Sequence, residues 1–142
     1  MQIPGADDLI KVFGHWPSFH DAEVVRFLLE RAEPFGAGPN VVADVHVFEM
    51  TDQVGADGAY VLRHHTLVSF RFAGADQVVL EEFNNQNVLW DLAITDIRDR
   101  QLQDLKYEIT FASSFGMGAR FLCREVTIET VRPWEGREEN AG

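Results

Sequence analysis

The chain has 142 residues, a length that fits one domain with its own core, and 46% of them are hydrophobic, which excludes a disordered chain. No apolar run reaches the roughly 20 residues that a membrane-spanning helix needs. Lys and Arg total 12 against 23 Asp and Glu, so the formal net charge is −11; a chain this acidic repels phosphate backbones, which argues against nucleic-acid binding.

The first predicted element is a short amphipathic helix over residues 6–13. Its apolar residues fall on one side, and Asp7 and Asp8 lie in its first turn. Acidic side chains at this position stabilise the positive end of the helix dipole. Gly14 follows directly, and a glycine at this place is a common helix stop.

From residue 22 onwards the hydrophobic period is mostly two, which is typical of strands. In the first such run, Val25, Phe27 and Leu29 are predicted to share one face. Later runs alternate in the same way. The predicted strand runs are residues 22–31, 41–50, 67–73, 77–83, 92–99, 105–112 and 119–131.

Short segments rich in turn-forming residues separate several of these runs. Connections of this length allow hairpins, whereas parallel strands need crossovers of a dozen or more residues. The sequence therefore predicts an α+β fold, with a predominantly antiparallel β-sheet of about six to seven strands and a short N-terminal helix. No repeat or linker divides the chain, so we expect a single domain over residues 1–142, with a frayed tail from about residue 135.

The connection between the helix and the first strand is dense in aromatic and polar side chains. Pro17 disfavours helix at Trp16, and we expect Trp16 and Phe19 to pack the turn onto the sheet. Asp21 can bond neighbouring backbone N–H groups, as in an Asx turn. Together with His20, these residues are interpreted as a structural corner.

The same stretch also raises the question of chemistry, because His20 and Asp21 are adjacent. No nucleophile motif accompanies the pair, and neighbouring residues on a strand point in different directions, so we predict no catalytic residue. A zinc site needs three or four ligands, and His46, His64 and His65 lack the spacing of a metal motif. We expect no metal site and no cofactor.

Two further features favour structural roles. The lone Cys123 cannot form an intramolecular disulfide, and its place in the run RFLCREV predicts a small buried hydrophobic residue. The glycine-rich segment 115–118 joins two predicted strands and opens no helix, so it lacks the helix N-terminus of a phosphate-binding loop. We interpret it as a hairpin turn.

Six acidic residues in the middle of the chain are candidates for partner binding. Glu81 and Glu82 are adjacent and point to opposite faces of a predicted strand. The three Asp that follow lie in a predicted loop and strand start, without the residue ladder of a calcium loop. We predict a solvated acidic face, of which only part can act together. The candidate residues are Asp76, Glu81, Glu82, Asp91, Asp96 and Asp99.

The order of short motifs along the chain resembles the immunity protein 50 family. The matching segments are a short helix followed by WPSFHDAEV and a strand, then EFNNQNV, then a C-terminal strand of the type RFLCREVTIE. The likeness spans about residues 13–131 and leaves out GADGAYVLRHH and the acidic tail. Members of that family are predicted antidotes encoded beside polymorphic toxins of bacteria. The resemblance implies a small cytoplasmic α+β protein that binds and neutralises a cognate toxin and has no catalysis of its own.

Charge and resemblance together favour a non-catalytic protein-binding module, whose cognate toxin would present a basic surface to the acidic chain. One alternative is a small-molecule-binding protein or enzyme that uses the concave face of the sheet, with His20, Asp21 and His46 lining a pocket. A second alternative is a structural subunit of a homo-oligomer, because exposed sheet edges invite pairing. The N-terminus shows no basic and apolar signal regions, so the expected location is the cytoplasm, with no membrane partner.

Overall fold

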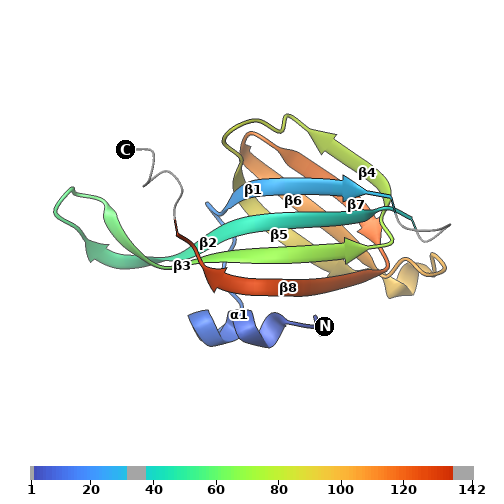
Figure 1. Cartoon of the computed structure of the whole chain (residues 1–142), viewed down its shortest axis with the longest axis horizontal. Coiled ribbons are helices and arrows are strands. Elements are labelled where there is room, and N and C mark those ends of the chain that lie inside the picture. The colour runs from blue at the N-terminus through green and yellow to red at the C-terminus, as the bar shows by residue number, and fades with distance from the viewer. Residues whose placement is uncertain (1, 32–37, 136–142) are drawn as a thin grey trace.

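The computed structural model of the chain describes residues 2–31 and 38–135 (Figure 1). These residues form one α-helix, one 3-10 helix and eight strands, so the prediction of six to seven strands is slightly too low. The predicted run over residues 119–131 divides at Arg124 into two strands. The tail expected to fray lies, apart from Glu135, outside the described residues. The elements are α1 (Ala6–Phe13), β1 (Glu23–Glu30), β2 (Asn40–Val54), β3 (Tyr60–Ala73), β4 (Asp76–Glu81), β5 (Val88–Asp96), η1 (Arg98–Arg100), β6 (Tyr107–Phe115), β7 (Gly118–Cys123) and β8 (Glu125–Pro133).

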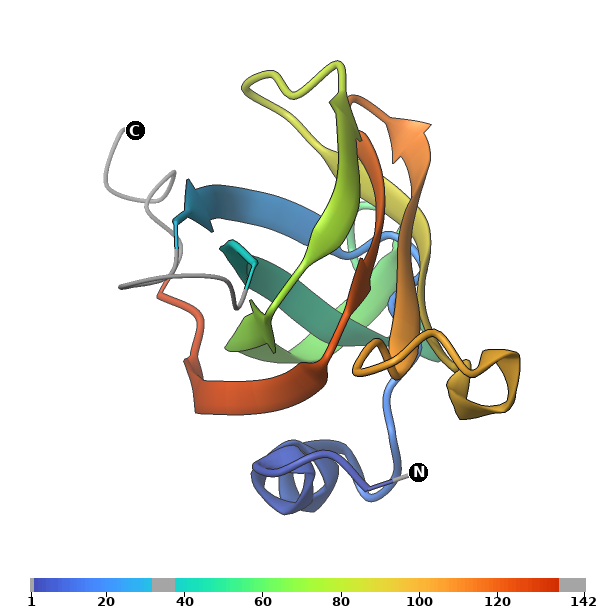
Figure 2. The ribbon, with the colours of Figure 1, turned by 90° about the vertical axis from the view of Figure 1, so that its right-hand side faces the viewer.

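The eight strands form one sheet in the order β4-β7-β6-β5-β1-β2-β3-β8, and neighbouring strands pair antiparallel. The chain turns between β3 and β4 at Gly74 and Ala75, and between β7 and β8 at Arg124. As a result the sheet bends into two halves that face each other, as Figure 2 shows. One half consists of β1, β2, β3 and β8, and the other of β4, β7, β6 and β5. The pair Glu23–Val88 connects β1 with β5, and the open sheet has β4 and β8 at its edges.

Helix α1 has the bounds that the sequence predicts. Gly14 adopts a φ of 81°, and its N–H donates to the Ile10 carbonyl at 2.6 Å, which ends the helix. Leu9 and Phe13 are buried, so the face of α1 that carries them packs against β3 and β8, and the helix lies below these strands in Figure 1.

The segment before α1 lies along the outer edge of β8. The Ile128 N–H donates to the Pro4 carbonyl at 2.8 Å. Gly5 has a φ of 88°, and it approaches the Ile128 carbonyl so closely that a Cβ would clash with it. The N-terminal segment therefore covers part of the β8 edge.

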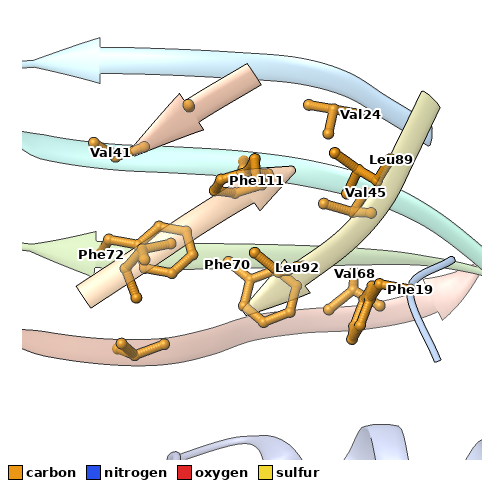
Figure 3. Close-up of a cluster of buried hydrophobic side chains, with 14 of the residues drawn as sticks. Phe19, Val24, Val41, Val45, Val68, Phe70, Phe72, Leu89, Leu92 and Phe111 are labelled. Carbon is orange, nitrogen blue, oxygen red and sulfur yellow. The ribbon is translucent and has the colours of Figure 1, made fainter. Parts of the chain in front are cut away.

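The core lies between the two halves of the sheet and contains several Phe rings (Figure 3). The Phe72 ring of β3 lies 5.9 Å from Phe111 of β6 and 5.2 Å from Phe121 of β7, measured between centroids. Phe70 stacks beside Phe72 at 5.7 Å. All four side chains are at most 1% exposed. Because aromatic rings bury large apolar areas, these contacts hold the two halves together.

The alternation predicted for β2 and β3 is confirmed. Ala43 pairs with Phe70 and Val45 with Val68, and all four side chains are fully buried. These pairs place one apolar face of both strands against the opposite half of the sheet.

The face predicted for β1 is wrong in part. The register shifts between Val24 and Arg26, which marks a bulge. Val24 is therefore buried, whereas Val25 and Leu29 are 39% and 49% exposed. Phe27 keeps its inward contact, since its ring lies 5.7 Å from that of Phe111.

Beyond the core, β2 and β3 continue as a long two-stranded hairpin that projects away from the rest of the sheet (Figure 1). We call residues 48–65 the hairpin arm. None of its side chains is buried, in contrast to the adjoining Val47 and Thr66. The arm therefore contributes little to the core.

Cys123 ends β7 with a fully buried side chain, as the sequence predicts, and burial raises the pKa of its thiol to about 12. Since the thiolate is the reactive form, we expect a thiol reagent at about pH 8 to leave the native chain unmodified and to label it fully in denaturant. The measurement is absorbance of the released chromophore, with free cysteine as the control. Rapid labelling of the folded protein would contradict this expectation.

Candidate functional site

The residues of the predicted corner are held in different ways. The Phe19 ring is 2% exposed and lies 5.8 Å from Phe70, so it belongs to the core. Trp16 covers Phe19 from outside at 5.8 Å and remains 37% exposed. Pro17 is buried between them in the chain. Phe19 therefore packs onto the sheet through Phe70, whereas Trp16 lies over Phe19 at the surface.

The next part of the corner is tied to β5 through the backbone. Asp21 has a φ of 70°, and its N–H donates to the Leu89 carbonyl at 2.8 Å. Its carboxylate lies 3.4 Å from His20 Nδ1, and the His20 ring meets the exposed Trp90 ring edge-on at 4.6 Å. The His20 and Asp21 side chains are thus half-exposed beside β5.

A pocket of about 320 Å³ opens between this corner and the base of the hairpin arm. His46, which the sequence also offers as a pocket residue, lies elsewhere: its Nε2 is 2.9 Å from His65 Nδ1, and its ring stacks on Trp134 at 4.5 Å. The pocket is lined by Phe13, His15, Pro17, Ser18, His20, Asp21, Phe48, Glu49 and Met50.

Glu49 occupies the arm side of this pocket. Arg63 Nε donates to Glu49 Oε1 at 2.6 Å, and His64 Nε2 lies 3.7 Å from the same oxygen. The hydrogen bond from Arg63 holds the pKa of the Glu49 carboxyl below its ordinary value. Within residues 2–31 and 38–135, no three His, Cys, Asp or Glu side chains gather as a group that could hold a metal ion.

The six candidate acidic residues are all exposed but do not form one cluster. Asp76 and Glu81 lie at the two ends of β4, with Glu82 just beyond. Asp91 and Asp96 both belong to β5, so the predicted loop around Asp91 is a strand. Because β7 and β6 separate β4 from β5, the two groups are about 14 Å apart across the sheet. The sixth residue, Asp99, lies in η1.

Basic side chains neutralise only part of this set. Arg98 lies 3.8 Å from Asp96, and the Arg98 backbone N–H donates to the same carboxylate at 2.9 Å. No Lys, Arg or His of the described chain forms an ion pair with any of the other five carboxylates. Within the described residues, these five carboxylates therefore remain as uncompensated surface charge.

Two polar residues with defined roles were missed by sequence reasoning. Asn87 is 2% exposed, and its Oδ1 accepts hydrogen bonds from the backbone N–H groups of Asn84 and Met117 at 3.0 and 3.1 Å. It therefore links the connection between β4 and β5 to the turn between β6 and β7. Asp44 is 8% exposed and accepts from Ser69 Oγ at 2.6 Å. The sole sequence signal for Asp44 is an acid within a strongly apolar strand.

The fold and this surface define a small α+β protein that is built on one bent antiparallel sheet and carries exposed carboxylates. None of the helices described is long and apolar enough to cross a membrane. The model of the Immunity protein 50 family matches residues 5–134, so the chain belongs to that family. The match includes residues 55–65, which the resemblance seen in the sequence left out. No curated protein and no solved structure matches the chain significantly.

The corner can be tested by comparing two aromatic truncations. We expect Phe19→Ala to lower the free energy of unfolding by about 3–5 kcal/mol, because it removes a ring from the core. Trp16→Ala should lower the free energy of unfolding clearly less, because part of the Trp16 ring already contacts water. Urea unfolding followed by circular dichroism measures both variants. Equal losses would show that Trp16 supports the fold as strongly as Phe19.

Proposed function

We propose that the protein is an immunity protein that binds a cognate bacterial toxin and neutralises it without catalysis. The observation that carries this proposal is the match of the Immunity protein 50 family over residues 5–134. The acidic surface supports it, because a net charge of −11 suits a basic partner.

The proposed mechanism is occlusion guided by charge. Exposed carboxylates on β4 and β5 attract a basic toxin surface during diffusional encounter, and the bound protein then excludes the toxin's own substrate. Asp76, Glu81, Glu82, Asp91 and Asp99 are the candidates for steering, because no cation of the described chain pairs with them. Asp96 contributes less because Arg98 lies beside it.

Co-expression tests the function directly. A toxin gene beside the gene for this protein is placed under a separate inducer, and growth is measured with and without the protein. We expect full growth only when both are expressed, and a stable complex on affinity purification. Phe19→Ala, which we expect to lower the free energy of unfolding, serves as a destabilised control. Toxicity that persists in the presence of abundant, folded protein would overturn the proposal for that toxin.

Steering by charge predicts a specific effect on the association rate. In Glu82→Lys/Asp91→Lys, association with the toxin should slow markedly, and the difference from wild type should shrink as salt rises to about 0.5 M, because the screening length then falls well below 10 Å. Stopped-flow or surface plasmon resonance measures the rates.

The matched control for this prediction is Glu125→Lys/Glu129→Lys on β8, which changes the net charge equally on a strand that carries none of the six candidate residues. We expect it to slow association less than the first variant. If both double variants slow association to the same extent, only the overall charge acts, and the proposed steering residues have no special role.

A further inference from the structure

The hairpin arm is ordered by its own polar contacts. At its base the Arg63–Glu49 ion pair joins the two strands at 2.6 Å, and further out Thr51 Oγ1 donates to the Val61 carbonyl at 2.7 Å. At its tip the Gly55 N–H donates to the Ala59 carbonyl at 2.7 Å. Because an isolated two-stranded hairpin is only marginally stable in water, such cross-links help to hold the two strands of the arm together.

One face of the arm is apolar and open to solvent. Met50 pairs with Leu62, and Val54 pairs with Tyr60, so each pair projects to one face. Tyr60 and Leu62 are two residues apart on β3, which places both pairs on the same face. The four side chains are between 37% and 64% exposed. A contiguous apolar patch on a soluble protein commonly marks an interface.

The apolar face continues into the pocket at the base of the arm. Met50 belongs to both, and Phe48 and Pro17 extend the apolar lining of the pocket. Asp21 and Glu49 both line this pocket, but the Glu49 carboxylate already pairs with Arg63, whereas the Asp21 side chain is partly exposed. An apolar recess with the Asp21 carboxylate at its border suits a Lys or Arg side chain, whose aliphatic stem packs while its charged end meets that carboxylate.

We propose that the hairpin arm and its basal pocket form the docking surface for the toxin, an inference that rests on the proposed function. The arm enters a groove of the toxin that is lined by apolar side chains and bordered by Lys or Arg. One basic side chain of the toxin enters the basal pocket.

Charge favours this occupant over a second copy of the chain. The arm carries Glu49, Asp52 and Asp57 against Arg63 as its one Lys or Arg, and the whole chain has a net charge of −11. Two copies meeting through their arms would bring like charges together, whereas a basic groove complements them. The arm supplies affinity through apolar burial, and the more distant carboxylates supply steering.

The test uses Tyr60→Ala/Leu62→Ala, which removes apolar area from the proposed contact face, with the full-length chain and the toxin recovered by co-expression. We expect affinity to fall roughly tenfold or more, mainly through faster dissociation, because central apolar contacts act as binding hot spots. Val61→Ala is the matched control, because Val61 lies on β3 between these residues and points to the other face. It should bind within about twofold of wild type.

The outcomes separate the two proposals. If wild type neither binds nor rescues, the proposed function fails. If wild type does both and the double variant, with an unchanged circular dichroism spectrum, binds equally well, the docking surface is wrong while the function stands. Sedimentation of the free protein tests whether a second copy of the chain occupies the arm. If the wild type is a dimer and Tyr60→Ala/Leu62→Ala is a monomer, the arm is a dimer interface and the docking proposal is overturned.

Discussion

The contact between aromatic rings across the bent sheet is the constraint on which the rest of the structure depends. Phe72 meets Phe111 and Phe121 only because β3 passes into β4, and β7 into β8, with a change of direction. Without that change, the apolar faces of the two halves would stay open to water. Burying them is the main source of stability available to a chain with no disulfide.

This constraint also decides which parts of the chain are left for binding. Helix α1 packs against β3 and β8, and the N-terminal segment covers part of the β8 edge. Phe19, in the connection between α1 and β1, packs on Phe70 of the core. Most of the hairpin arm lies beyond the reach of the core, so Val54, Tyr60 and Leu62 remain 64%, 56% and 37% exposed. Apolar residues retained on such a projection are consistent with a role in recognition.

The sequence was informative wherever a local pattern is enough to determine the structure. The bounds of α1 follow from a glycine stop, and the buried faces of β2 and β3 follow from strict alternation. The bulge after Val24 and the division at Arg124 depend on pairing with distant strands, which local periodicity does not encode. For the same reason, sequence reasoning grouped Asp76 with Asp91 although β7 and β6 lie between their strands.

Charge and apolar area act at different stages of association, which explains why one small protein can use both. In the proposed complex, exposed carboxylates such as Glu82 and Asp91 would act over a screening length and raise the encounter rate, whereas water weakens their attraction once contact is made. Side chains such as Tyr60 and Leu62 have no influence at a distance and act only when water is expelled. Because an ion pair and hydrogen bonds join the two strands of the arm, less conformational freedom would be lost on docking than from an unstructured loop. Under the proposed function, fast encounter and slow release would therefore arise from separate parts of one sheet.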